Sequence, residues 1–171
     1  MGQCHYLANL TKKQVIHPHQ IGNGVKLREQ IGRPYATATA LVMLLAASSK
    51  EGGRGGGDFR TRHPLVGSWA GDRVAFIGDY AEPDDIPGAD AALIYKQCRA
   101  ACAASPPETP PPGGQDWTNI SAQVRAMMSA EFGIRYQGAG WLDIVDEQPQ
   151  PAPMPRCPDL VLAPAARSGR T

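Results

Sequence analysis

CHYLANLTKKQVI, from Cys4 to Ile16, contains two short apolar runs separated by a polar interval. The first run, Cys4 to Leu10, is apolar and aromatic with the partial alternation of a β-strand. Gln14 to Ile16 resumes as a second short strand after the polar residues Thr11-Lys12-Lys13, which suit a turn. We therefore predict a β-hairpin over residues 3–17 that opens the domain.

Beyond the hairpin, the sequence indicates three helices and one strand with clear limits. A helix is predicted over Thr37 to Ser48, which is rich in Ala and Leu and lacks Gly and Pro. Arg73 to Ile77 has the composition of a strand. Asp90 suits the N-cap of a helix that runs through Ala104, and Gly133 suits the end of a helix that starts near Ser121. Weaker patterns predict a short helix over 25–31 and strands over 141–145 and 158–163.

This order of elements does not show the regular strand–helix alternation of a parallel α/β protein. It predicts an α+β fold, with a small, mostly antiparallel sheet, helices packed on one side, and long Gly- and Pro-rich loops. Five glycines lie within residues 52–57, and eleven of the 16 prolines lie within 106–112 and 149–164. We therefore expect one domain over residues 1–148, with flexible loops at 49–65 and 105–116, and a Pro-rich C-terminal extension over 149–171.

The formal net charge is +1, which disfavours a dedicated nucleic-acid-binding protein. The charge is nevertheless uneven, because residues 1–73 carry 10 Lys and Arg against 4 Asp and Glu, whereas residues 74–171 carry 7 against 12. No stretch reaches the roughly 18–20 apolar residues of a membrane-spanning helix, so no membrane partner is expected. The start has no secretory signal pattern, which predicts a cytoplasmic protein whose four cysteines are free thiols.

A possible metal site consists of His17, His19 and Asp79. His17 and His19 are two residues apart, so on a strand both imidazoles would share one face of the sheet. A carboxylate from Asp79 would complete a ligand set for zinc or another divalent ion, the one cofactor that the sequence suggests. The intervening Pro18 favours a turn instead, which would leave two surface histidines.

A second candidate site is the stretch Gly52 to Asp58, with Arg54 inside it. Successive glycine N–H groups can bind a phosphate, and the Arg54 guanidinium could pair with it. The stretch follows a predicted helix, however, and it lacks the Gly-Lys-Ser/Thr of a phosphate-binding loop. A flexible loop is the simpler interpretation.

A third candidate is WAGDR, Trp69 to Arg73, with the Gly78-Asp79-Tyr80 step that follows the predicted strand. Asp and Gly are favoured in turns, so the two Gly-Asp steps bracket this strand. We select Trp69, Asp72, Arg73, Asp79 and Tyr80 from it as candidate binding residues, together with Arg54 and Asp58. The acidic residues that follow, up to Asp85, could bind a hard cation such as Mg²⁺ or Ca²⁺. They lack the spacing of an EF-hand, so a solvated acidic turn is the simpler interpretation.

Two segments resemble a family of small uncharacterised proteins. These proteins open with Met-Gly-x-Tyr and an Asn-Leu-x-Lys-Lys run, which here is Asn9 to Lys13. They also carry a Trp-Ala-Gly-Asp-Arg and Gly-Asp-Tyr signature, similar to Trp69 to Arg73 and Gly78 to Tyr80. The resemblance covers residues 1–45 and 66–87, and Cys4 stands where tyrosine is expected. It implies a natural family module and assigns no catalytic residue.

The sequence therefore favours a binding or interaction module, without enzymatic activity, for a protein partner or a small ligand. One alternative is a metal-dependent hydrolase or nucleotide-processing enzyme that uses His17, His19 and Asp79, with Arg73 or Arg54 on a phosphate. Another alternative is a structural or assembly subunit, an oligomer whose Pro-rich arms reach its neighbours.

Overall fold

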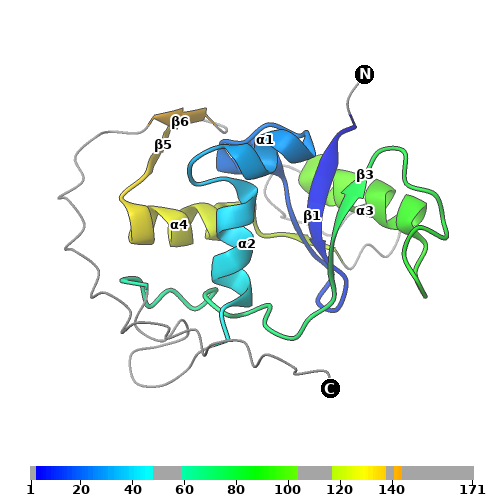
Figure 1. The fold of residues 1–171 in the computed structure, drawn as a ribbon, viewed down its shortest axis with the longest axis horizontal. Helices are drawn as coiled ribbons and strands as arrows, with labels where there is room; N and C mark the ends of the chain where they lie inside the picture. The colour runs from blue at the N-terminus through cyan, green and yellow to red at the C-terminus, as the bar shows by residue number, and fades with distance from the viewer. Residues whose placement is uncertain (1–2, 48–58, 104–116, 138–140, 144–171) are drawn as a thin grey trace, which may run out of the picture.

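A computed structural model describes residues 3–47, 59–103, 117–137 and 141–143 of the chain. Figure 1 shows strands and helices that alternate irregularly along the described part. The helices are the 3-10 helix η1 (Pro18–Ile21), α1 (Leu27–Gly32), α2 (Thr37–Leu45), α3 (Ala91–Ala103) and α4 (Ser121–Phe132). The strands are β1 (His5–Asn9), β2 (Gln14–Ile16), β3 (Val74–Gly78), β4 (Thr118–Asn119), β5 (Arg135–Gln137) and β6 (Trp141–Asp143).

The main sheet has the order β3-β1-β2-β4, so β1 and β2 are its inner strands. β1 pairs antiparallel with β2 and with β3, and β2 pairs parallel with β4. The predicted hairpin is thus confirmed, and its polar turn includes Lys13 at a φ of 51°. β5 and β6 form a separate two-stranded sheet.

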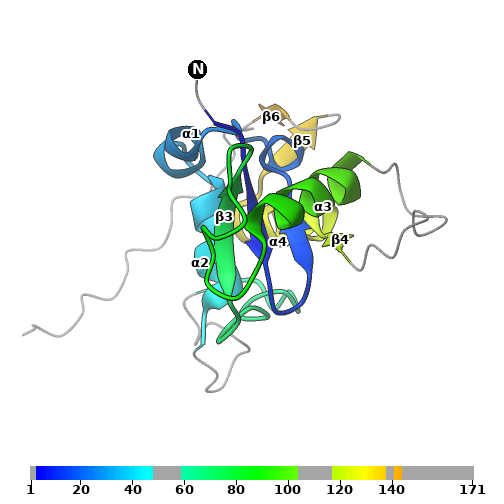
Figure 2. The same cartoon turned by 90° about the vertical axis from the view of Figure 1, so that its right-hand side faces the viewer.

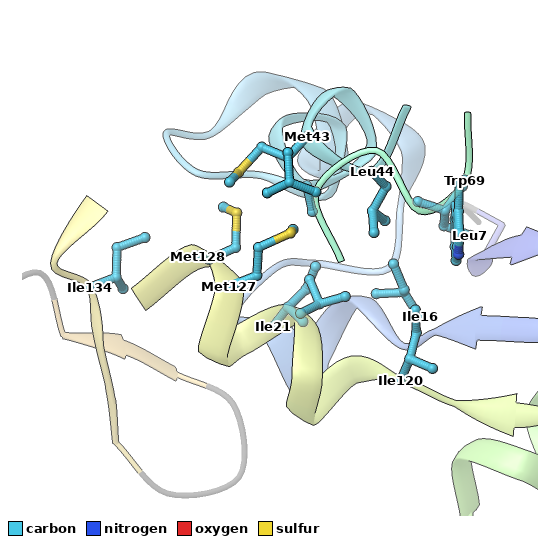
Figure 3. Packing of buried hydrophobic residues seen from close by; sticks show 13 residues of the cluster. Leu7, Ile16, Ile21, Met43, Leu44, Trp69, Ile120, Met127, Met128 and Ile134 are labelled. Atoms are coloured by element: carbon cyan, nitrogen blue, oxygen red, sulfur yellow. The ribbon is translucent and has the colours of Figure 1, made fainter. Parts of the chain in front are cut away.

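Two hydrophobic clusters lie on opposite faces of the sheet, because successive side chains of a strand point to opposite sides. Leu7 of β1 belongs to the larger cluster, which α2 and α4 cover. Figure 3 shows Met43 of α2 facing Met127 and Met128 of α4 across this cluster. Ala8, the next residue of β1, belongs to the smaller cluster beneath α3. Both Leu7 and Ala8 have no solvent-exposed surface, so the middle of the sheet is buried on both sides.

The α+β class with a small, mostly antiparallel sheet is confirmed. The structure differs from the prediction in the placement of the helices, which cover both faces instead of one. The physical reason is that β1 carries apolar side chains on both sides, and each side needs a covering layer. Figure 2 shows α2 and α3 on either side of β3.

The local sequence predicted where several helices begin or end. Asp90 caps α3 through a 2.8 Å hydrogen bond from the Leu93 N–H to its Oδ1, and Gly133 ends α4 with a φ of 68°. The predicted helix at Thr37 ends at Leu45. Gly52 to Asp58 and the predicted strand over 158–163 lie outside the described residues. Among the described helices, none has the length and apolar character needed to cross a membrane.

The buried side of α2 offers a test of the larger cluster. Leu44→Ala removes a side chain with no exposed surface, and we expect a loss of about 2–5 kcal/mol in the free energy of unfolding. Val42 lies on the same helix but is 64% exposed, so Val42→Ala is expected to change stability by no more than about 0.5 kcal/mol. Urea denaturation of both variants measures the difference, and equal losses would contradict this packing.

Candidate functional site

Asn9 to Lys13 and Trp69 to Arg73 meet at the turn between β1 and β2. The Asn9 Nδ2 donates to Asp72 Oδ2 at 2.8 Å, and the Lys12 ammonium lies 3.0 Å from the same oxygen. Asn9 Oδ1 also accepts the Lys12 N–H at 2.9 Å. These contacts hold the pKa of the Asp72 carboxyl below its usual value, first through the hydrogen bonds from Asn9 and Lys12. Asp72, selected as a binding residue, therefore fastens the hairpin to the segment before β3.

Trp69 also has a structural place in the fold. Its side chain is fully buried in the larger cluster, and its indole N–H donates to Gln14 Oε1 at 2.7 Å. A tryptophan with no exposed surface and a satisfied N–H presents nothing to a ligand. Trp69 is therefore corrected from a binding residue to a core residue that links the segment before β3 to β2.

The predicted metal ligands do not form a site. His17 and His19 have ring centroids 5.5 Å apart, and the His17 Nδ1 accepts the His19 N–H as η1 begins. Asp79 follows β3, two strands away from β2 in the sheet, and its Oδ1 accepts the Cys4 N–H at 3.1 Å. Across the described residues, no three His, Cys, Asp or Glu side chains are grouped so that they could hold a metal ion. The turn at Pro18 prevented the strand geometry on which this prediction depended.

Burial shifts the pKa values of several side chains beneath α3 and at the start of η1. Burial raises the pKa of the Cys102 thiol to about 12 and raises that of Cys98 further. Burial likewise raises the pKa of Tyr6 to about 12. Burial, and then the neighbouring His19, lower the pKa of His17. The two thiols are thus poor nucleophiles, and they serve as small apolar residues of the smaller cluster.

One of the remaining candidate residues, Tyr80, lines a hollow beside β3, hereafter the edge hollow. It encloses about 350 Å³ between the strand and the loop that leads to α3. In Figure 1, this green loop lies on the side of β3 away from β1. The strand supplies Ala75, Phe76, Ile77 and Gly78, the chain start supplies Gln3 and His5, and the loop side supplies Tyr80, Ala81, Asp85, Ile86 and Ala91.

Two hydrogen bonds fasten the loop to the two ends of β3. At the start of the strand, the Arg73 Nη2 donates to the Pro87 carbonyl at 2.7 Å. At its end, the Ala81 N–H donates to the Gly78 carbonyl at 3.1 Å. Arg73 therefore positions the loop, whereas Tyr80, which is 60% exposed, lines the edge hollow itself. The other two selected residues, Arg54 and Asp58, lie outside the described part of the chain.

Glycine at position 78 lets two polar side chains approach the strand closely. A Cβ at this position would lie 2.9 Å from His5 Nε2 and 3.2 Å from Gln3 Oε1, closer than normal packing allows. The other nitrogen of the imidazole, Nδ1, is buried without a hydrogen-bond partner in the described structure. His5 and Gln3 therefore place polar atoms over the end of the strand, within the edge hollow.

The backbone of β3 faces this hollow with unpaired groups. The Leu10 N–H donates to the Arg73 carbonyl at 2.8 Å, and the Asp79 N–H donates to the Cys4 carbonyl at 3.1 Å. In an antiparallel pair, residues whose N–H and C=O groups face the partner alternate with residues whose groups face away. Position 76 therefore turns its N–H and C=O away from β1, and among the described residues neither group of Phe76 has a hydrogen-bond partner.

The sequence did not reveal this role of Phe76. In this region the sequence indicated only a strand, from the composition of Arg73 to Ile77, and a run of acidic residues after that strand. Composition shows that a strand forms, but it does not show which neighbours the strand will have. The free edge became visible only once β1 was paired with β2 on one side and with β3 on the other.

The contacts of Asp72 with Asn9 and Lys12 predict a pH-dependent contribution to stability. The substitution Asp72→Asn keeps a side-chain oxygen that can accept the hydrogen bond from Asn9, but it removes the negative charge that pairs with Lys12. We expect the free energy of unfolding at pH 7 to fall by up to about 1 kcal/mol. Because folding lowers the pKa of Asp72, its contribution is present above about pH 4 and is lost as the pH falls through the lowered value.

Urea denaturation at pH 7 and at about pH 2 measures this difference, which is expected to shrink at the lower pH. Asp84→Asn is the matched control, because Asp84 is exposed and forms no hydrogen bond or ion pair with the described residues. Equal effects of the two substitutions at pH 7 would argue against the role of Asp72.

Comparison with known proteins adds no assignment to this site. No family model matches the chain, and no curated protein or solved structure is detectably similar to it. The chemistry of the edge hollow therefore has to be taken from its own residues, which are an unpaired stretch of strand backbone, an imidazole, an amide, a phenol and a carboxylate.

Proposed function

We propose that the protein is a binding module that takes an extended peptide segment along the free edge of β3. The observation that carries the proposal is the unpaired N–H and C=O of Phe76 at the edge hollow. Addition of a strand to an exposed sheet edge is a common mode of peptide recognition, in which backbone hydrogen bonds provide affinity and pockets for side chains provide specificity.

The spacing of the free backbone groups supports a peptide over a compact ligand. The N–H of Gly78 also faces away from β1, and a two-residue step along a strand spans about 6.6 Å. Another extended chain presents its acceptors and donors at the same repeat. An added antiparallel segment can exchange both hydrogen bonds with Phe76 and accept one from the Gly78 N–H.

The length of the added segment is limited by the loop. The Gly78 carbonyl already accepts from the Ala81 N–H, so pairing with a new strand ends there. The contact between Arg73 and Pro87 ties the loop to the other end of the strand. A volume of about 350 Å³ is within the usual range for ligand pockets, which is about 300–1,000 Å³. A peptide segment of a few residues, centred opposite Phe76, fits these limits.

The two other functions considered from the sequence have less support. The metal-dependent hydrolase required His17, His19 and Asp79 to converge, and the described structure does not bring them together. The assembly subunit depended on the Pro-rich segments, which lie outside the described residues.

Two substitutions at one position test the role of the backbone N–H. Phe76→Ala and Phe76→Pro both remove the ring, but only proline also removes the N–H. That N–H faces away from β1, and proline is tolerated on this side of an edge strand. We expect Phe76→Pro to bind the neutral peptide Ac-Val-Gln-Val-Gln-Val-NH2 about tenfold more weakly than Phe76→Ala, since leaving a hydrogen-bonding group unpaired costs about 1–3 kcal/mol.

The measurement is a titration of the 15N-labelled full chain followed by NMR, with the Phe76 and Gly78 amides of the unsubstituted protein as reporters. Circular dichroism verifies that both variants are folded. Equal affinity of the two variants, or a titration that leaves the Phe76 and Gly78 amides unmoved in the unsubstituted protein, would count against the proposal. The second readout needs no variant, so it holds even if a substitution prevents folding.

A further inference from the structure

We infer that the peptide segment held at the edge of β3 is basic, with Lys or Arg at alternate positions. This inference rests on the proposed function and adds the chemistry of the partner. It starts from the charge beside the edge hollow. Residues 74–95 contain five acidic side chains and no Lys or Arg. The five are Asp79, Glu82, Asp84, Asp85 and Asp90, and all of them are exposed.

Arg73 contacts this loop, but its guanidinium donates to the Pro87 carbonyl and not to a carboxylate. No Lys or Arg of the described chain forms an ion pair with any of the five carboxylates, whereas the ion pair of Asp72 with Lys12 lies at the opposite end of β3. Asp85 Oδ2 accepts the Glu82 N–H at 2.9 Å, which holds the loop in shape without adding a cation. Carboxylates gathered beside a concave surface produce a local negative potential that attracts a positive ligand.

The charge lies where side chains of an added strand would project. Asp85 is one of the residues that line the edge hollow. The loop lies on the α3 side of the sheet, because Ala81 and Ile86 pack against the smaller cluster beneath α3. Side chains of an added strand alternate between the two faces of the sheet, so every second one would project toward this loop. These are the positions at which we expect Lys or Arg, while the side chains between them project toward His5 and Gln3.

The same carboxylates have an alternative role. Charged residues beside an exposed strand can stop it from pairing with the edge of another copy. In that case, the acidic loop would protect β3 and bind no peptide. The two roles differ in what the unsubstituted protein does with a basic peptide, and this difference determines the experiment.

The experiment titrates the 15N-labelled full chain with three blocked peptides that differ only in charge. They are Ac-Val-Lys-Val-Lys-Val-NH2, the neutral Gln peptide and Ac-Val-Glu-Val-Glu-Val-NH2. At low ionic strength we expect the basic peptide to bind about tenfold more tightly than the neutral one and the acidic peptide to bind most weakly. The preference is expected to fall at about 0.5 M salt, because exposed charges are then screened.

Charge-removing variants of the loop identify the source of the preference. In the triple variant Glu82→Gln, Asp84→Asn and Asp85→Asn, we expect the basic and neutral peptides to bind within about threefold of each other. Glu131→Gln is the matched control. Glu131 belongs to α4, on the other face of the sheet. Its side chain accepts a hydrogen bond from the Thr61 N–H, and the oxygen of a glutamine can accept the same bond. This control is expected to keep the full preference.

The outcomes separate the inference from the proposed function. If the three peptides bind equally well and move the Phe76 and Gly78 amides, the inference is wrong and the edge still binds peptides. If none of them moves these amides, both proposals fail. Light scattering measures whether the triple variant self-associates. If it does, and if the unsubstituted protein binds no peptide, the acidic loop protects the edge.

Discussion

β1 is hydrogen-bonded along both of its edges, and this constraint determines what its neighbours can do. Leu7 stands opposite Ile16 of β2 and opposite Phe76 of β3. The backbone groups of β1 alternate between the two partners, so the register with β3 also determines which groups of β3 face away. A shift of one residue would turn Phe76 toward β1 and would exchange the buried faces of the strand. The free edge and the hollow beside it are therefore consequences of the register.

The contacts among Asn9, Lys12 and Asp72 help to hold this register. They join the turn of the hairpin to the residue two positions before β3, which fixes where the strand begins. Trp69 adds a buried contact to Gln14 on the neighbouring strand. The segments Asn9 to Lys13 and Trp69 to Arg73 thus lie in contact, and Asn9, Lys12 and Asp72 have a structural explanation. The contacts among Asn9, Lys12 and Asp72 place β3, while the groups of the proposed site belong to the strand itself, to the chain start and to the loop after the strand.

The two edges of the main sheet differ in what they offer to another chain. β4 contains only Thr118 and Asn119, and α4 begins two residues later, so this edge is short. β3 has five residues and a loop that leaves a hollow beside it. A longer exposed edge is a place where a further strand can pair, and natural proteins commonly place charges beside it. The acidic loop therefore has a physical reason to lie at this edge whether it selects a partner or excludes one.

The sequence alone determined the features that depend on neighbouring residues. The hairpin, the capping of α3 by Asp90 and the end of α4 at Gly133 all follow from contacts within a few positions. The acidity of residues 79–90 is likewise a property of the sequence. Only the tertiary structure decided that helices cover both faces, that Trp69 is core, that His17 and His19 stay apart from Asp79, and that Phe76 has a free backbone edge. These features depend on which strands pair and in which register, and pairing between residues about 70 positions apart leaves no local pattern in the chain.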